Sequence, residues 1–316
     1  MSILLTGATG FVGSALLRRL HGDGCDVAAL VRAPVASLAV AALPRYVGGP
    51  WGSADFCAAL SGVTSVVHLA ARVHVMRDKE SDPLAAFRAV NVQGTLNLAR
   101  QSAAAGVRRF VFVSSVKVNG ECTLAGCAFT EADTPAPQDA YGRSKYEAET
   151  GLRELGAQTG MAVVIVRPPL VYGPGVKGNF ASLLQAVQRG WPLPLGAVRN
   201  RRSLVALDNL VDFLSRCIFH PQAANQTFLV SDGHDLSTPE LVRGLAKAAG
   251  LPARLVPLPM WVLQAGAAVV GKGDALQRLC GNLQVDISRA RSRLAWNPPL
   301  SVHEGLQCVI AGSQGR

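Results

Sequence analysis

The chain has 316 residues, of which 49% are hydrophobic and 16% charged, and its formal net charge is +10. This balance excludes a disordered chain and is typical of one dominant core with a smaller appended lobe. The positive charge favours an anionic small molecule over nucleic acid as partner, because the densest basic cluster, Arg199 to Arg202, lacks interleaved aromatic residues.

The seven cysteines are scattered, with no C-x-x-C pair and no histidines at metal-ligand spacing. They predict reduced thiols in a cytoplasmic protein without a metal site. A strand-like run starts at Ser2 and leaves no room for a signal peptide. The most apolar later stretch, Leu258 to Val270, contains Pro259 and is shorter than the about 20 residues of a spanning helix. We therefore expect a core or lid helix there, and no membrane partner.

Short apolar runs alternate with helical patterns through the first half of the chain. The predicted strands are Ser2–Thr6, Asp26–Val31, Ser65–Leu69, Arg109–Ser114 and Ala162–Arg167. The predicted helices are Val12–His21, Phe87–Ala105 and Ser144–Thr159. This alternation predicts an α/β fold with a Rossmann-type, doubly wound parallel sheet. Pro- and Gly-rich pieces follow Pro168, so we expect a dinucleotide-binding domain over 1–170, to which later segments return, and a smaller, mixed substrate lobe over 171–316.

Three glycines, Gly7, Gly10 and Gly13, fall between the first strand and the first helix. Without Cβ atoms at these positions, a pyrophosphate can approach the backbone and the N–H groups at the start of the helix. The turn therefore predicts a dinucleotide site.

The second strand carries the signal for cofactor choice. An NAD-selecting carboxylate usually stands at its carboxyl end, but Asp26 is at the other end and Arg32 follows Val31. A guanidinium there can pair with a 2′-phosphate, which favours NADP over NAD. The alternative is a solvated arginine on a loop.

Tyr141 and Lys145 are four residues apart, on one face of a helix predicted to begin near Asp139. A phenol needs a nearby positive charge to act as an acid or base at neutral pH. Lys145 and the positive nicotinamide ring would supply that charge. The pair comes roughly 130 residues after the glycine turn, and Ser114 and Ser115 stand at the end of an intervening strand.

Taken together, these motifs resemble the extended short-chain dehydrogenase/reductases of the nucleotide-sugar epimerase/dehydratase type. The matching stretches are Thr6 to Gly13, His68 to Ala71, Asn91 to Thr95, Val113 to Gly120, Tyr141 to Lys145, Arg167 to Gly175, Arg202 to Asp212 and Asp286 to Gly305.

The resemblance implies that Ser115 hydrogen-bonds the reacting sugar oxygen, Tyr141 transfers the proton, and Lys145 holds the nicotinamide ribose. The cofactor-binding residues expected are Gly7, Thr9, Gly10, Phe11, Val12, Gly13, Arg32, Leu69, Ala70, Ala71, Ser114, Tyr141, Lys145, Pro168 and Val171. A UDP-linked sugar is the expected substrate. Its expected ligands are Lys117, Asn179, Arg202 and Arg278, and a homodimer is one expected assembly.

Two departures from the family pattern bear on function. Gly48 to Trp51 lacks the Gly-Asp that similar proteins use near adenine, and Asn119 replaces the Tyr usual before Gly120. The run Val113 to Gly120 looks like that of bacterial enzymes acting on UDP-linked 4-keto-6-deoxy-N-acetylhexosamines in surface-polysaccharide synthesis. In such a protein Lys117 touches the sugar or the diphosphate, and the alternative is a structural lysine.

These features favour a reductase that exchanges NADPH and acts at C4 of a UDP-4-keto sugar. A UDP-hexose or UDP-N-acetylhexosamine 4-epimerase with retained NAD stands close behind. A reductase of another ketone class and a non-catalytic NADP-sensing protein are less favoured. The first leaves the arginines without an anionic ligand, and the second has no need of Ser115, Tyr141 and Lys145 together.

Overall fold

The structure, a computed structural model, describes residues 1–31, 43–46, 49–73, 82–269, 271 and 273–314. Within these residues the main sheet has seven strands, all parallel, in the order β3-β2-β1-β4-β5-β6-β9. The strands are β1 (Ser2–Thr6), β2 (Asp26–Val31), β3 (Leu43–Tyr46), β4 (Ser65–His68), β5 (Arg109–Val113), β6 (Ala162–Arg167) and β9 (Thr227–Leu229). The predicted doubly wound Rossmann-type sheet is confirmed.

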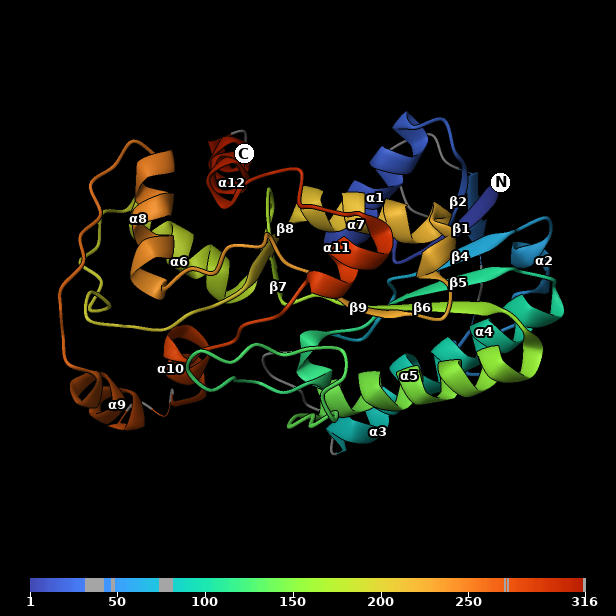
Figure 1. Cartoon of the computed structure of the whole chain (residues 1–316), viewed down its shortest axis with the longest axis horizontal. Helices are drawn as coiled ribbons and strands as arrows, with labels where there is room; N and C mark the ends of the chain where they lie inside the picture. Colours follow the sequence, from blue (N-terminus) through green and yellow to red (C-terminus); the bar gives the residue numbers. More distant parts are fainter. Residues whose placement is uncertain (32–42, 47–48, 74–81, 270, 272, 315–316) are drawn as a thin grey trace.

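Helices cover both faces of this sheet (Figure 1). On one face lie α1 (Phe11–Gly22), α7 (Leu207–Phe219) and α11 (Ser288–Leu294), and on the other lie α2 (Cys57–Leu60), α3 (Pro83–Arg88), α4 (Thr95–Ala104) and α5 (Ala140–Thr159). Because successive side chains of a strand point to opposite faces, Ile3 and Leu5 of β1 pack in one core and Leu4 in the other. This two-sided burial explains the continuous apolar runs in the sequence.

The chain order reverses between β1 and β4, which are neighbours in the sheet although β2 and β3 lie between them in sequence. Ligands of open α/β sheets bind at such a switch point, at the carboxyl ends of the strands. The turn after β1, the segment after β4 and the segment after β5 all open on this edge. The fold therefore brings the predicted cofactor and catalytic segments to one side of the sheet.

The helix predicted over Phe87–Ala105 differs from the structure. Helical residues begin at Pro83, and a π-helical turn over Ala89–Gly94 separates α3 from α4. A Cβ on Gly94 would lie only 2.9 Å from the Cβ of Trp51, so a glycine lets the turn approach that side chain. The π turn carries the buried Asn91, whose contacts are described below.

A second lobe is built around the short strands β7 and β8, which pair in parallel. Its elements are β7 (Leu170–Tyr172), β8 (Leu204–Ala206), α6 (Gly178–Gln188), α8 (Thr238–Ala248), α9 (Met260–Val269), α10 (Gly273–Cys280) and α12 (Val302–Gln314). The core of this lobe includes Tyr172 and Phe180, whose rings stack with centroids 5.6 Å apart. Two short 3-10 turns, Val116–Val118 and Pro221–Ala223, complete the described elements.

Helix α9 is less buried than the sequence led us to expect. It forms within the apolar stretch, but none of its residues is buried, so of the core or lid helix expected there the core alternative is wrong. The helix is apolar, but other elements do not enclose it. Hydropathy alone could not have predicted this, because it does not report which elements pack against a helix. In the described chain, no helix has both the length and the apolar character needed to cross a membrane.

Candidate active site

The glycine turn after β1 forms a close-packed cradle. Gly7 has a φ of +69°, and a Cβ there would lie 2.8 Å from the backbone nitrogen of Ala70. A Cβ on Gly13 would lie 2.0 Å from the carbonyl oxygen of Gly7. Helix α1 starts directly afterwards, and Gly10 at its N-cap supplies no capping side chain. The first N–H groups of α1 thus remain open beside exposed Thr9 and Gly10, an arrangement that fits the pyrophosphate of a dinucleotide.

A buried series of hydrogen-bonded side chains, called here the His68 network, links this turn to the end of β4. Thr6 Oγ1 lies 2.7 Å from His68 Nδ1, and His68 Nε2 lies 2.9 Å from Thr95 Oγ1. The Ala70 N–H donates to the same Thr6 oxygen over 3.1 Å. Burial, together with the charge of Lys145, lowers the pKa of His68 to about 3, so the imidazole is neutral. The His68 network fixes the segment over Leu69 to Ala71, where the cofactor was expected to bind.

Asn91 is a second buried clamp on the same edge. Its side chain accepts a hydrogen bond from the Arg72 N–H over 2.8 Å and donates one to the Arg72 carbonyl over 3.0 Å. It also donates to Ser144 Oγ on α5 over 3.0 Å. The loop after β4 is thereby tied to the helix that carries Tyr141. Sequence reasoning matched the stretch Asn91 to Thr95 but gave Asn91 no role.

The three predicted catalytic residues come from two adjacent segments. Ser115 follows β5 and caps the short 3-10 turn, because its Oγ accepts from the Lys117 N–H over 3.2 Å. Tyr141 and Lys145 lie one turn apart on α5. The Lys145 Nζ donates to the Val113 carbonyl oxygen over 2.9 Å, which ties α5 to the end of the strand that leads into Ser115.

Electrostatics around Tyr141 and Lys145 differ from the sequence-based expectation. Burial lowers the pKa of Lys145 to about 7, against the opposing charge of Glu149. The Lys145 nitrogen lies 4.5 Å from the Phe112 ring centroid and 6.0 Å from that of Tyr141. Burial and the Asp139 carboxylate raise the pKa of Tyr141. We expected Lys145 to lower the pKa of the Tyr141 phenol, but the protein groups alone raise it.

Helix α5 begins at Ala140, as the predicted start near Asp139 implied and four residues before the predicted range Ser144–Thr159. Asp139 caps it by accepting a hydrogen bond from the Gly142 N–H over 2.7 Å. Burial acts to raise the pKa of Asp139, but hydrogen bonds from Lys117 and Gly142 hold it below its ordinary value. Lys117 is ion-paired with Asp139 and with Glu121. The geometry thus ties Lys117, the expected sugar ligand, to the start of α5.

Behind the catalytic segments lies a buried ion-pair network that sequence reasoning missed. Arg167 donates to the Glu149 carboxylate over 2.9 and 2.6 Å, and Ser114 Oγ donates to it over 2.6 Å. A further Arg167 nitrogen donates to Asn119 Oδ1 over 2.9 Å. Asn119, the departure from the family pattern, is therefore a partner of this buried arginine and also donates to the Thr130 carbonyl. The only sequence signal was the i, i+4 spacing of Lys145 and Glu149.

The remaining expected cofactor residues lie near these segments where the structure describes them. Phe11 and Val12 open α1. Pro168 is buried after β6, and its carbonyl accepts from the Val116 N–H over 3.0 Å, which places it beside the serine loop. Val171 lies in β7. Arg32 falls outside the described residues.

The expected substrate ligands divide into two groups. Arg202 is half-buried, its guanidinium donates to the Gly281 carbonyl over 2.9 Å, and burial lowers its pKa. Gly281 directly follows α10, which carries Arg278, so the two arginines belong to one region. Arg278 Nε is buried and has no hydrogen-bond partner in the described part of the chain. Asn179 is exposed in the first turn of α6.

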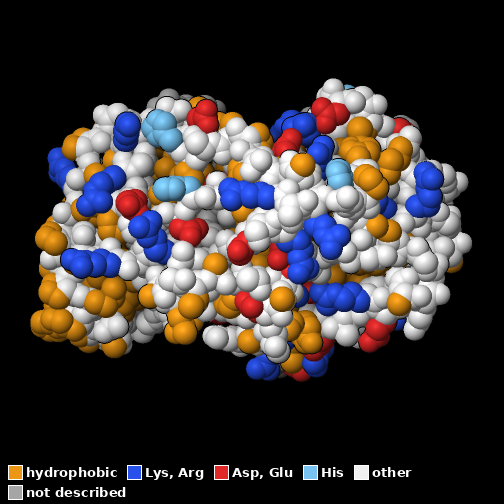
Figure 2. Space-filling model, in the orientation of Figure 1, with side chains coloured by type: hydrophobic (Ala, Val, Ile, Leu, Met, Phe, Trp, Pro, Cys, Tyr) orange, Lys and Arg blue, Asp and Glu red, His pale blue; other side chains and the backbone are white. Residues whose placement is uncertain are grey.

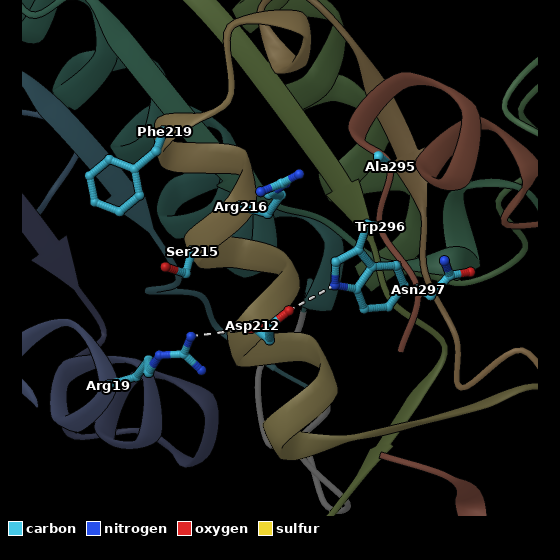
Figure 3. Close-up of a pocket in the computed structure, with 8 residues that line it drawn as sticks. All are labelled: Arg19, Asp212, Ser215, Arg216, Phe219, Ala295, Trp296 and Asn297. Carbon is cyan, nitrogen blue, oxygen red and sulfur yellow. Dashed lines mark hydrogen bonds and ion pairs between the residues drawn. The ribbon is translucent and has the colours of Figure 1, made fainter. Parts of the chain in front are cut away.

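A pocket of about 390 Å³ lies elsewhere, between α1, α7 and the segment after α11 (Figure 3). Within it, Asp212 accepts from Trp296 Nε1 over 2.9 Å and from Arg19 over 3.2 Å. Arg216 donates to the Leu294 carbonyl. These polar groups satisfy one another, and none of the predicted site residues lines this pocket.

Comparison with known proteins decides the family. The model of the NAD dependent epimerase/dehydratase family matches residues 3–231. The chain belongs to this family. A protein named UDP-glucose 4-epimerase from Vibrio cholerae is 51% identical over 97% of this chain and 93% of its own length.

One further relative and one solved structure are informative. The N-acetyl-alpha-D-glucosaminyl-diphospho-ditrans,octacis-undecaprenol 4-epimerase of Escherichia coli O157:H7 is 28% identical over 98% of this chain and 94% of its own. The solved structure of MoeE5 in complex with UDP-glucose and NAD superposes with a TM-score of 0.79 at 25% identity, covering 100% of this chain and 99% of that one.

Membership of the epimerase/dehydratase family confirms the resemblance and the enzyme class: this is an NAD-dependent extended short-chain dehydrogenase/reductase. The NADP preference inferred from Arg32 is not supported, since the family is described as NAD dependent. The 4-ketoreductase interpretation is not confirmed either. The relatives' names favour the alternative, an epimerase.

Proposed function

We propose that this protein is a UDP-hexose or UDP-N-acetylhexosamine 4-epimerase that keeps its NAD bound through turnover. The observation that carries the proposal is the 51% identity, over 97% of the chain, to a protein named UDP-glucose 4-epimerase. The grouping of Ser115, Tyr141 and Lys145 at the edge where the dinucleotide turn also opens supports it. MoeE5, whose solved structure holds UDP-glucose and NAD, supports the ligand class.

The cofactor would lie along the carboxyl edge of the sheet. The cradle of Gly7, Gly10 and Gly13 would take the pyrophosphate at the start of α1, and the clamped segment over Leu69 to Ala71 would border it. NAD, when bound, supplies the acceptor and donor of the hydride at sugar C4. The protein's task is then to hold the sugar and to move one proton.

Tyr141 is the proposed proton carrier. Its phenolate would take the proton of the sugar 4-hydroxyl and return it after the sugar has turned its other face, so that no proton is consumed overall. Ser115 would hold the same oxygen by a hydrogen bond, since its hydroxyl can donate while its oxygen accepts from the Lys117 N–H. Lys145 would supply the positive charge that stabilises the phenolate.

The buried state of Lys145 has a consequence for this chemistry. With a pKa of about 7, the ammonium loses its proton readily near neutral pH, and only the charged form can stabilise a phenolate. Glu149, one turn later on α5, is the group that favours the charged form. The network of Glu149 and Arg167 thus acts on the chemistry through Lys145.

Arg202 and Arg278 are the proposed ligands of the substrate diphosphate. Two guanidinium groups from neighbouring segments suit a doubly charged diphosphate, and the unpaired buried Nε of Arg278 needs a partner that a ligand oxygen would provide. Asn179 and Lys117 remain candidate ligands, although the ion pairs of Lys117 favour a structural role.

The test of this function uses purified protein without added nucleotide. UDP-glucose and UDP-N-acetylglucosamine are incubated separately and the products resolved from their C4 epimers. We expect one or both to be converted, and we expect about one NAD per chain to be released on denaturation. No conversion of either sugar without added cofactor would contradict the epimerase.

The second candidate is the 4-ketoreductase, and one observation favours it. Strand β2 begins at Asp26 and ends at Val31, so the carboxyl end of the strand lacks the carboxylate that holds the ribose of a retained NAD. A cofactor held less firmly suits exchange at every turnover. Oxidation of NADPH or NADH on adding a UDP-4-keto sugar, followed by absorbance at 340 nm, would favour this candidate.

A further inference from the structure

Helix α9 presents an uncharged, apolar surface at the outer end of the second lobe. From Met260 to Val269 the sequence has no charged residue. The exposed fraction is 70% for Trp261 and 87% for Val269, although both side chains are large and apolar. Monomeric soluble proteins seldom leave such surface uncovered unless it meets another surface.

Further exposed apolar side chains lie on the segment after α6 and on the segment that leads into α9. The segment after α6 pairs with the segment that leads into α9, through hydrogen bonds between Leu193 and both Arg254 and Val256 over 2.8 Å each. Trp191 and Val256 on these two segments are 54% and 40% exposed. We call Trp191, Val256, Trp261 and Val269 the apolar tip. In Figure 2 hydrophobic side chains gather at the lower left, where α9 lies in Figure 1.

The chain around the apolar tip is basic. The sequence has no Asp or Glu from Leu155 to Leu207, nor from Leu241 to Gly273, and these two stretches supply α6, most of α8 and α9. Arg189 stacks over the Trp191 ring at 5.3 Å, and the guanidinium carbon of Arg254 lies about 4.0 Å from where a Cβ on Gly190 would stand. Exposed arginines thus border the exposed tryptophan.

We propose that the apolar tip docks on the surface of an anionic phospholipid bilayer. A short apolar helix with an exposed tryptophan, bordered by arginines and free of carboxylates, has the chemistry that the interface of such a bilayer recognises. The apolar side chains enter the headgroup boundary and the arginines meet lipid phosphates. This docking is peripheral, and it revises the expectation of no membrane partner.

A second copy of the chain is the competing occupant, and charge argues against it. Two copies meeting through this end would bring two predominantly basic stretches together in a protein of formal net charge +10. An anionic bilayer carries the opposite charge. Docking by this end leaves the nucleotide-binding edge of the main sheet free.

The test is cosedimentation of the full chain with vesicles of phosphatidylcholine alone or with about one third phosphatidylglycerol. We expect binding to the anionic vesicles that weakens as salt rises, because the arginine contribution is screened. Trp261→Asp should reduce binding at least about tenfold, since a charge replaces an inserted ring. Trp261→Phe should retain most of the binding.

Phe219→Asp is the matched control. Phe219 is also an exposed aromatic residue, at 46%, but it ends α7 on the nucleotide-binding domain. This variant should bind vesicles as the unchanged protein does. The KM of Trp261→Asp for a soluble UDP-sugar should also be unchanged.

Three outcomes would overturn the proposal. The first is the absence of binding to anionic vesicles, and the second is equal loss in Trp261→Asp and Phe219→Asp. The third is that Trp261→Asp abolishes a concentration-dependent dimer or raises the KM, which would assign the apolar tip to a second copy or to the substrate cleft. The vesicle measurement does not depend on catalysis, so its failure leaves the proposed epimerase untouched.

Discussion

The proposed catalytic edge of the main sheet, where Ser115, Tyr141 and Lys145 lie, and the apolar tip of the second lobe are opposites in composition and burial. At the catalytic edge, charged and polar groups such as Glu149, Arg167 and Lys145 are almost fully enclosed. At the apolar tip, Trp261 and Val269 are exposed. A buried charge costs much free energy unless it is paired and hydrogen-bonded, whereas a single exposed apolar side chain costs little. Each region departs from the usual inside-outside rule, in opposite directions, and we propose a function for each.

The largest expected effect concerns the catalytic edge. Tyr141→Phe removes only the phenolic hydroxyl, which carries the transferable proton, and should lower kcat by roughly 100- to 10,000-fold while leaving NAD binding intact. Steady-state kinetics and NAD content measure both quantities. Exposed Tyr146, one turn further along α5, is the control: Tyr146→Phe should retain activity. A Tyr141→Phe enzyme within a few-fold of the unchanged protein would exclude the phenol from proton transfer.

Burial of Lys145 should appear as a pH dependence of stability. Its folded pKa of about 7 lies below the ordinary 10.5, so the folded chain binds fewer protons than the unfolded chain between these values. The cost of burying the ammonium is therefore complete below about pH 7 and disappears as the pH rises to 10.5. Each pKa unit corresponds to about 1.4 kcal/mol.

Lys145→Met lacks this titration and should gain stability relative to the unchanged protein at low pH, by several kcal/mol more than at high pH. Denaturant unfolding at about pH 6 and about pH 10 measures the two differences. Lys247→Met, an exposed substitution on α8, should show no comparable change between the two pH values. If Lys145→Met behaves like Lys247→Met, the lysine is not buried as the structure has it.

Glu149→Gln tests the network behind the site. The substitution keeps the shape of the side chain but leaves Arg167, 2% exposed, without its counter-charge. We expect a loss of about 3–5 kcal/mol in the free energy of unfolding. Glu147→Gln on the same helix breaks only the exposed pair with Arg88 and should cost at most about 1 kcal/mol. An equal loss in the free energy of unfolding for the two variants would contradict the burial of the Glu149–Arg167 pair.

Arg202→Ala addresses the substrate side. Loss of a charge-assisted contact to a diphosphate, about 1.5–3 kcal/mol, should raise the KM for the UDP-sugar roughly 10- to 150-fold while affinity for NAD changes little. The adjacent, exposed Arg201 provides the control variant Arg201→Ala. A KM unchanged in Arg202→Ala would return this arginine to a structural role.

The smallest effect is expected at the apolar tip. Because α9 has no buried residue, Trp261→Asp should change the free energy of unfolding by no more than about 0.5 kcal/mol. Leu245→Asp on α8, at a fully buried position of the same lobe, should be strongly destabilising. A large loss in Trp261→Asp would show that the tip is part of the folded core.

The sequence predicts the longer strands of the main sheet better than it predicts the shortest strands and the burial of α9. The predicted strands Ser2–Thr6, Asp26–Val31 and Ala162–Arg167 coincide with β1, β2 and β6, because two-sided burial produces apolar runs bounded by turn residues. Strands β7, β8 and β9 are three residues long, too short for any periodic signal, and were not predicted. The apolar stretch before Val270 predicted a helix, but its burial depended on neighbours that hydropathy does not encode.

The candidate site shows a similar limit. The places of Tyr141 and Lys145 on one helix, and of the glycine turn before α1, were predictable because they depend on local spacing. The partners of Arg167 were not, since Glu149 and Asn119 are 18 and 48 residues away in sequence and meet it only in the folded chain. The same holds for His68 between Thr6 and Thr95.

The central claim is that this site moves hydride and proton at C4 of a UDP-sugar and returns both to the same molecule. The direct measurement uses a UDP-hexose labelled with deuterium at C4, incubated with the protein and excess unlabelled NADH. We expect the C4 epimer with the deuterium retained, because the cofactor stays bound. Absence of the epimer, or an epimer that has lost its deuterium to the NADH pool, would contradict it.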